Sequence, residues 1–163
     1  MKKIVLIGFA TSGKSSVGKL LADELKAKFV DTDAEIERDC GMTVQQIFDT
    51  YGETYFRQKE NQLLNTLAAQ QNIVVACGGG SVIAQSFPQL AESSVVIWLT
   101  ATAATVKSRL GNAPRPLFDG LSEQQLAAFI DRRTPLYKRY ATATIPTDNL
   151  STEQIIVNIK TFL

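Results

Sequence analysis

The chain alternates short apolar runs with longer segments in which apolar residues recur every three or four positions. Five apolar runs have the length of strands, at residues 3–7, 28–31, 73–77, 95–99 and 142–145. The segments between them fit amphipathic helices, and one at residues 53–69 carries a stripe of Phe56, Leu63, Leu64, Leu67 and Ala68. This alternation is typical of a mostly parallel sheet covered on both faces by helices. We therefore expect an α/β fold with three layers, helices on either side of one sheet.

Three of the expected helices begin with a capping box, in which a Ser or Thr and a Gln three residues later bond to each other's backbone N–H. The pairs are Thr43 with Gln46, Ser122 with Gln125, and Ser151 with Gln154. The helix after the last box is expected to bury Ile155, Ile156, Ile159 and Phe162. Residues 110–120 are instead rich in glycine and proline, which predicts a turn-rich, mobile segment.

Residues 8–15 read G-F-A-T-S-G-K-S and form what we call the phosphate loop, placed between a strand and a helix that begins near Lys14. In the pattern G-x-x-x-x-G-K-[ST], backbone N–H groups close around phosphate oxygens, and the next helix points its positive dipole end at them. Lys14 is expected to reach the β- and γ-phosphates, and Ser15 to bind Mg²⁺. The nucleotide-binding set also takes in Thr11, Ser12, Gly13 and Ser16. The alternative, a plain glycine-containing turn, leaves the flanking strand and helix unexplained.

Composition narrows the class of protein. A length of 163 residues with 45% hydrophobic content suits one domain over residues 1–163. The net charge of +1, from 17 basic and 16 acidic residues, gives no basic excess that would indicate a nucleic acid or an acidic membrane as partner. The chain has no histidine, which excludes a Ser-His-Asp hydrolase. A general base must then be a carboxylate, cysteine, lysine or tyrosine.

The two cysteines indicate the compartment. Cys40 and Cys77 are far apart in sequence, and Cys77 lies in an apolar run, so we expect buried, reduced thiols. The apolar run after Lys2 and Lys3 is too short for a signal peptide, and no segment reaches transmembrane length. We therefore expect a cytoplasmic, monomeric protein with no membrane partner.

Residues 29–33 read F-V-D-T-D, so two carboxylates, Asp31 and Asp33, lie at the carboxyl end of the expected strand at residues 28–31. Strand alternation would put both carboxylates on one side, about 6 to 7 Å apart. Ligands of open α/β sheets bind beyond the carboxyl ends of the strands, so one carboxylate would hold a metal-bound water and the other would accept a hydroxyl proton during phosphoryl transfer. In the alternative, Asp33 only caps a helix that begins near Ala34, and Asp31 is a surface residue.

The glycines at residues 78–80 follow another expected strand. Three glycines allow a ligand to approach the backbone closely and expose N–H donors; the alternative is a flexible turn. Arg57 has Glu53 and Glu60 within one helical turn, close enough to orient its guanidinium.

Further arginines accompany the turn-rich segment. Arg115 lies between two prolines in that segment, where closure would bring its charge onto a transferring phosphate. Arg109 precedes it, and Arg132 and Arg133 lie near the end of the following helix. A solvated surface role is the alternative for each.

Taken together, these motifs resemble the shikimate kinase family, a group of small P-loop kinases related to nucleoside monophosphate kinases. The resemblance covers nearly the whole chain and rests on six motifs in order. They are residues 8–15, residues 29–33 with Ile36 and Glu37, residues 52–57 with Glu60, residues 78–80, residues 115–117 and residues 133–137.

The resemblance implies a five-stranded parallel sheet in the order 2-3-1-4-5, with the phosphate loop after the central strand. It implies transfer of the γ-phosphoryl group of ATP to the 3-hydroxyl of shikimate, with Mg²⁺ as the metal. The products would be shikimate 3-phosphate and ADP, in the biosynthesis of chorismate and the aromatic amino acids.

The same resemblance implies residue roles. Asp33 would bind the reacting hydroxyl and serve as base, while Arg57 and Arg133 would hold the shikimate carboxylate. The turn of Gly78, Gly79 and Gly80 would bind substrate, with the Gly79 N–H donating to a hydroxyl. Lys14 would neutralise charge between the phosphates, and Arg115 would reach phosphate when a lid at about residues 110–121 closes. Ser15 would bind Mg²⁺ directly and Asp31 through water, and Arg109 and residues 146–149 would contact adenine.

Thr11 departs from the family pattern, which usually has a glycine there, and threonine does not freely adopt positive φ. Either the loop has an ordinary conformation at this position, or nucleotide affinity is altered. Two other functions stay open at this stage, a gluconate-kinase-like enzyme and a catalytically silent nucleotide-binding module. The first does not explain Arg57, residues 78–80 and residues 133–137 together. Against the second stands the presence of all the residues expected to act in catalysis and binding: Lys14, Ser15, Asp33, Arg57, Arg115 and Arg133.

Overall fold

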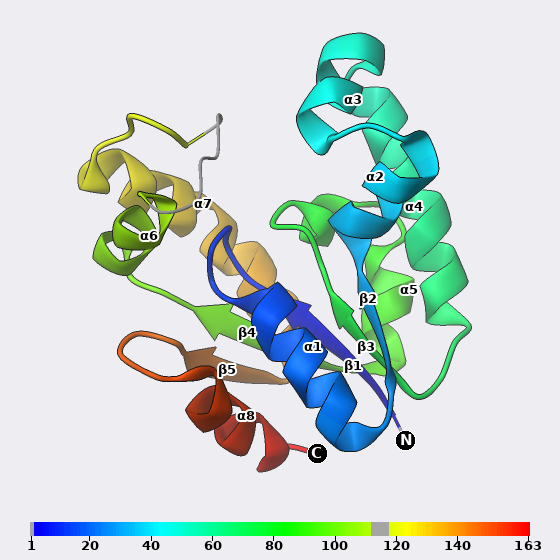
Figure 1. Cartoon of the computed structure of the whole chain (residues 1–163), viewed down its shortest axis with the longest axis vertical. Coiled ribbons are helices and arrows are strands. Elements are labelled where there is room, and N and C mark those ends of the chain that lie inside the picture. The colour runs from blue at the N-terminus through cyan, green and yellow to red at the C-terminus, as the bar shows by residue number, and fades with distance from the viewer. Residues whose placement is uncertain (1, 112–117) are drawn as a thin grey trace.

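A five-stranded parallel sheet forms the centre of the molecule. The computed structural model describes residues 2–111 and 118–163. The strands are β1 (Lys3–Ile7), β2 (Lys28–Asp31), β3 (Ile73–Ala76), β4 (Ser94–Thr100) and β5 (Ala143–Pro146). Their order is β2-β3-β1-β4-β5, and every neighbouring pair is parallel (Figure 1). The predicted order and all five predicted strands are confirmed, with ends that differ by at most one residue.

Helices cover both faces of the sheet because β1 to β4 carry apolar residues on both sides, whereas β5 buries only Ala143 and Ile145, on one side. In β1, Ile4 and Leu6 face the core beneath α1 (Lys14–Leu25) and α8 (Thr152–Lys160). Val5 and Ile7 face the opposite core, which is covered by α4 (Glu53–Ala68), α5 (Phe87–Glu92) and α7 (Glu123–Tyr140). The predicted three-layer arrangement is therefore confirmed (Figure 1).

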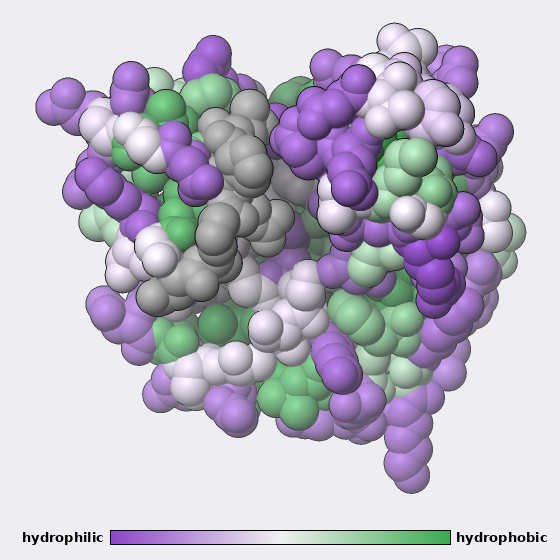
Figure 2. Space-filling model, turned by 45° about the horizontal axis from the view of Figure 1, so that its top comes forward, coloured by the Kyte–Doolittle hydropathy of each residue, from purple (hydrophilic) through white to green (hydrophobic). Residues whose placement is uncertain are grey.

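Two smaller groups of helices rise beyond the carboxyl ends of the strands. On one side, α2 (Thr32–Cys40) and α3 (Val44–Tyr51) pack with α4 around Ile36, Ile47 and Phe56. On the other, α6 (Ala103–Leu110) packs against α7. A short 3₁₀ helix, η1 (Ser81–Ile83), follows β3. The molecular surface is notched between the two groups (Figure 2).

The local signals for helix starts are confirmed. All three predicted capping boxes form, at the N-termini of α3, α7 and α8. The prediction that Phe162 belongs to the core is wrong, because α8 ends at Lys160 and the side chain of Phe162 is 50% exposed. Beyond a helix end, the helical period no longer decides which residues are buried.

The structure also tests the expectations about the cysteines and about membrane-spanning segments. Both cysteines are free thiols, and Cys77 is buried as expected, but Cys40 is only half-buried. Within residues 2–111 and 118–163, no helix combines the length and the apolar character that a membrane crossing requires.

Candidate active site

Two adjoining pockets lie beyond the carboxyl ends of the strands. The larger has a volume of about 480 Å³ and the smaller about 320 Å³. The larger pocket is bordered by α3, α4, α7 and the glycines at residues 78–80, and the smaller by the phosphate loop and Arg109. The residues that line both are Ala10, Asp33, Gly78 and Gly79. The two pockets therefore share a wall, at which Asp33 is the acidic side chain.

The side chain of Lys14 folds back across the phosphate loop and bonds to its backbone. Lys14 begins α1, and its Nζ donates to the carbonyl oxygens of Gly8 at 2.9 Å and Phe9 at 2.8 Å. The Oγ of Ser12, a fully buried residue, lies 3.3 Å from the same nitrogen. Of the residues expected to bind nucleotide, Thr11, Gly13, Lys14, Ser15 and Ser16 line the smaller pocket, whereas Ser12 supports Lys14 from beneath. The loop thus presents its lysine to this pocket.

Thr11 has the left-handed conformation that its residue type disfavours. Its φ is 62°, so the first of the two alternatives, an ordinary conformation at this position, is wrong. Its Oγ1 is buried and has no hydrogen-bond partner among the described residues. The Thr11 carbonyl, however, accepts from Nη1 of Arg109 at 2.8 Å. A contact from α6 therefore stabilises the strained residue.

Arg109 also connects the phosphate loop to the loop after β5. Its Nη1 donates to the Thr147 Oγ1 at 3.2 Å, and its Nη2 donates to the Thr147 carbonyl at 3.3 Å. The two regions expected to contact adenine, Arg109 and residues 146–149, therefore lie together beside the smaller pocket.

Asp31 differs from its expected position. Ser15 Oγ donates to the Asp31 carboxylate, and the other carboxylate oxygen accepts from the Ala34 N–H at 3.1 Å. Asp31 is therefore the N-cap of α2, which begins at Thr32. Strand alternation does not align Asp31 and Asp33, contrary to the prediction, because Asp33 lies in the first turn of a helix. The alternative, that Asp33 is the cap, is wrong as well.

The pair of Ser15 and Asp31 provides oxygen ligands of the type that Mg²⁺ prefers. Among the described residues, no cluster of three or more His, Cys, Asp or Glu could hold a metal ion by itself. The donor set fits Mg²⁺, which commonly takes one or two protein ligands and completes its shell with phosphate oxygens and water.

Asp33 occupies a space that a glycine leaves open. A Cβ on Gly78 would lie 2.5 Å from Oδ1 of Asp33, so only glycine allows this carboxylate its position. The Gly78 N–H donates to Thr32 Oγ1 at 2.9 Å, which fixes the turn against the start of α2. Burial raises the pKa of Asp33 to about 6, and the negative charges of Asp31 and Glu60 add to the rise. A carboxyl with such a pKa suits general base catalysis near neutral pH.

Arg57 is held by carboxylates as the sequence predicted. Its Nη1 donates to Glu60 Oε2 at 2.5 Å, and its Nε lies 3.5 Å from Glu53 Oε1. Glu60 is 1% exposed and also accepts from Ser81 Oγ at 2.6 Å. The buried Glu60 thus anchors Arg57 to the segment that follows the glycines.

Gly80 also makes room for Arg57. A Cβ on Gly80 would lie 2.7 Å from Nη2 of Arg57, and the Gly80 carbonyl is 3.4 Å from its Nη1. The interpretation of residues 78–80 as merely a flexible turn is therefore wrong: two of the three glycines accommodate the side chains of candidate site residues.

Arg133 faces the same pocket from the opposite side. It lies within α7, well before the helix end, and not near that end as expected. Its Nη1 is 3.6 Å from the position that a Cβ on Gly79 would take. The larger pocket therefore brings together Asp33, Arg57 and Arg133, which come from three helices. Arg115 and residues 112–117 of the expected lid lie outside the described residues.

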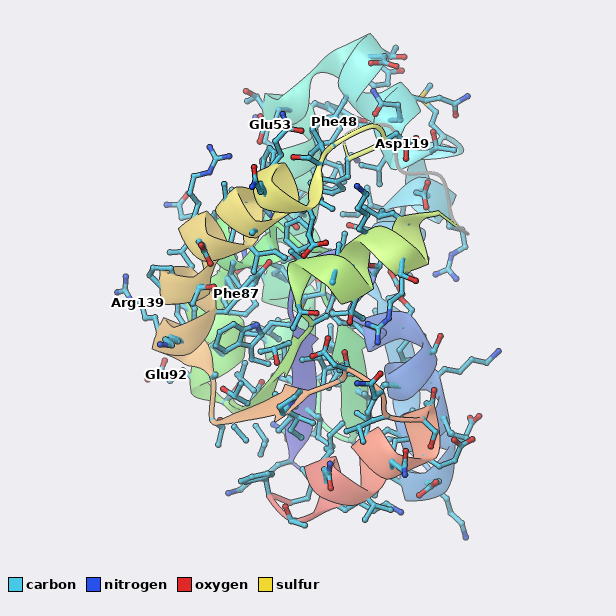
Figure 3. The ribbon with its side chains drawn as sticks, turned by 90° about the vertical axis from the view of Figure 1, so that its left-hand side faces the viewer. Phe48, Glu53, Phe87, Glu92, Asp119 and Arg139 are labelled. Atoms are coloured by element: carbon cyan, nitrogen blue, oxygen red, sulfur yellow. The ribbon has the colours of Figure 1, made fainter. Side chains whose placement is uncertain are left out.

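Sequence reasoning missed the aromatic part of the larger pocket. Val44, Gln45 and Phe48 of α3 line it, as do Phe9 and Phe118. The rings of Phe48 and Phe56 lie 5.0 Å apart. Figure 3 shows Phe48 and Glu53 together at the end of the molecule beyond the sheet. Apolar periodicity could not separate these residues from core residues, since both kinds follow the same helical spacing.

Comparisons with known proteins agree with this geometry. A sequence model of the family described as shikimate kinase matches residues 10–163. The shikimate kinase of Pelotomaculum thermopropionicum is 40% identical over 166 residues, covering 100% of this chain and 96% of its own. That of Chlorobium chlorochromatii is 43% identical over 157 residues, covering 89% of this chain and 82% of its own.

Solved structures give the same result. A shikimate kinase from Acinetobacter baumannii in complex with shikimate has a TM-score of 0.90 and 33% identity, covering 98% of this chain and 91% of that one. A gluconokinase from Sinorhizobium meliloti has a TM-score of 0.62 at 18% identity, covering 99% and 90%, and shares the fold alone. Because the family model matches residues 10–163 of the chain and two relatives are 40% and 43% identical, this chain belongs to the shikimate kinase family.

Proposed function

We propose that this protein transfers the γ-phosphoryl group of ATP to the 3-hydroxyl of shikimate, giving shikimate 3-phosphate and ADP in the biosynthesis of chorismate and aromatic amino acids. The observation that carries the proposal is the position of Asp33 on the wall between two pockets. One pocket is bordered by a phosphate loop, and the other holds two arginines suited to a carboxylate.

In the larger pocket, Arg57 and Arg133 would bind the carboxylate of shikimate, because a guanidinium can donate two parallel hydrogen bonds to it. Asp33 would accept the proton of the attacking hydroxyl, and the Gly79 N–H would orient another hydroxyl. Lys14, already directed across the phosphate loop, would offset negative charge on the transferring phosphoryl group. These residues act mainly by positioning and by electrostatic stabilisation, as phosphoryl transfer requires.

The smaller pocket would take the phosphates of ATP along Thr11, Gly13, Ser15 and Ser16. Ser15 directly and Asp31 through water would hold Mg²⁺, whose charge would stabilise the phosphates. Arg109 would contact adenine. Arg115 is proposed as the lid arginine, together with residues 110–121, and a cytoplasmic monomer is proposed as the working form.

The test is ADP formation by the purified protein with Mg²⁺ and ATP, with shikimate or gluconate as acceptor. We expect ADP with shikimate and none above background with gluconate. Asp33→Asn should lose turnover by at least about 10²-fold while circular dichroism shows an intact fold, since a positioned general base contributes roughly 10² to 10⁴ in rate. If shikimate does not raise ADP formation above the rate measured without an acceptor, the proposal is wrong.

A further inference from the structure

Tyr137 is a buried residue of α7 whose hydroxyl reaches the glycines at residues 78–80. The residue is 1% exposed, and its Oη donates to the Gly79 carbonyl at 2.8 Å. Its ring packs against that of Trp98 at a centroid distance of 5.7 Å. The ring alone would fill this part of the core, so packing does not explain why the residue carries a hydroxyl.

The same hydroxyl interacts with Arg133, which precedes it by one helical turn. Burial raises the pKa of Tyr137, and Arg133 opposes the rise through its charge and through a side-chain hydrogen bond. A phenolic hydroxyl can accept one hydrogen bond and donate another. Tyr137 therefore stands between the guanidinium of Arg133 and the Gly79 carbonyl.

The Gly79 carbonyl belongs to the peptide that leads into Gly80. Because a peptide unit is planar, holding this carbonyl also holds the N–H of Gly80 and the start of its backbone. Gly80 lies against the guanidinium of Arg57, which donates to the Gly80 carbonyl at 3.4 Å. One hydroxyl thus links the supports of both arginines of the larger pocket.

We propose that Tyr137 is a positioning residue that sets the placement of Arg57 relative to Arg133, so that both guanidinium groups meet one substrate carboxylate. The inference rests on the proposed function, which supplies that carboxylate. Tyr137 acts on substrate only through the arginines. Gly79 lines both pockets, but Arg57 and Arg133 line the larger pocket and not the smaller one, so the effect on binding is expected in the larger pocket.

Tyr137→Phe tests this, with Tyr140→Phe as the matched control. Tyr140 lies on the same helix, and its ring packs edge-on against Phe87 at 4.9 Å. In Tyr137→Phe, we expect the KM for shikimate to rise about tenfold, as for one hydrogen bond to a charged group. The KM for ATP should change less than about twofold and kcat less than about threefold, since the nucleotide pocket keeps its contacts.

A second readout needs no turnover. Trp98, the one tryptophan of the chain, contacts Tyr137, so its fluorescence should report shikimate binding without ATP. The dissociation constant for shikimate should rise in Tyr137→Phe by about the same factor as KM and stay unchanged in Tyr140→Phe.

Four results would overturn the positioning role: an unchanged shikimate KM, equal rises in both KM values, the same rise in Tyr140→Phe, or a Tyr137→Phe protein too unstable to assay. Each of these results would mean that the Tyr137 hydroxyl either has no effect on shikimate binding or contributes only to the stability of the whole fold. If the wild-type enzyme itself fails to phosphorylate shikimate, the proposed function fails first and this inference with it. An active wild type with an unaffected variant overturns the inference alone.

Discussion

At the scale of single residues, Asp33 is a group whose proposed function lowers the stability of the folded protein. Its carboxylate lies near two other acids, Asp31 and Glu60, in a place where burial already disfavours charge. The pKa of about 6 means that the protein prefers this group protonated, whereas the proposed reaction needs it ionised. The cost of ionising Asp33 should therefore be visible as a dependence of stability on pH.

We expect Asp33→Asn to be more stable than the wild type at neutral pH. The folded pKa of about 6 lies above the ordinary value of 3.8, so between these pH values the unfolded chain releases a proton that the folded chain keeps. The wild-type free energy of unfolding should fall through this window and stay low above pH 6. The difference between variant and wild type should grow from near zero at about pH 4 to about 3 kcal/mol at pH 7.

Urea denaturation at several pH values measures this difference. Asp39→Asn, an exposed residue of the same helix, is the control and should show no such growth. A difference between Asp33→Asn and wild type that stays constant from pH 4 to 7 would show that the buried carboxyl does not carry the effect.

Thr11 gives a second prediction at this scale. A φ of 62° is unfavourable for a residue with a Cβ, and the buried Oγ1 of Thr11 has no hydrogen-bond partner among the described residues. Thr11→Gly should remove both the backbone strain and the unpaired oxygen. We expect the free energy of unfolding to rise by about 1 kcal/mol, after allowing for the greater freedom of glycine in the unfolded chain. Thermal unfolding checks it. Lys26→Gly, at a φ of 52° on an exposed side chain, is the control and should stabilise less.

At the scale of elements, the glycines at residues 78–80 form a turn against which side chains from two helices, α2 and α4, pack closely. Gly78 admits Asp33 from α2, and Gly80 admits Arg57 from α4. Their conformations need no positive φ, since neither residue is among those with positive φ. The requirement for glycine here comes from space and not from backbone geometry.

Gly78→Ala and Gly80→Ala should therefore have different kinetic effects. The first displaces Asp33, and a shift of about 1 Å near the reacting atoms should lower kcat by about 10²-fold. The second displaces the end of a flexible arginine, so it should chiefly raise the KM for shikimate. Steady-state kinetics on both variants, with melting temperatures as the check on folding, measures this. The same change in kcat and KM for both would mean that the turn responds as a unit.

At the scale of the whole molecule, the order of the strands decides where the two pockets meet. β1 is central; the chain passes from it to β2 and then β3 on one side, and afterwards to β4 and β5 on the other. Such a switch of direction leaves a crevice beyond the carboxyl ends of the strands. Helices on both sides of this crevice supply the pockets: α3 and Arg133 of α7 line the larger pocket, Arg109 of α6 lines the smaller one, and Asp33 of α2 lines both. The proposed two-substrate site is thus a consequence of the topology.

Features that depend on neighbours in the sequence were predicted from the sequence. The strands, the three capping boxes, the phosphate loop and the ion pairs of Arg57 with Glu53 and Glu60 all involve residues a few positions apart. Their physical causes are local: apolar periodicity, hydrogen bonding at helix ends and the spacing of one helical turn. The sheet order came from the resemblance to a family, because short-range patterns do not specify which strands become neighbours.

Other features were decided only by the tertiary structure. Asp33 reaches the shared wall of the pockets because α2 begins at Thr32 and because Gly78, 45 positions later, leaves it room. The Thr11 carbonyl accepts a hydrogen bond from Arg109, and the Gly79 carbonyl accepts one from the hydroxyl of Tyr137. These contacts join residues that are distant in the chain, and their energies arise only when packing brings the groups within a few ångströms. The sequence by itself determined which chemical groups are present and the local elements that carry them; the tertiary structure decided which groups meet.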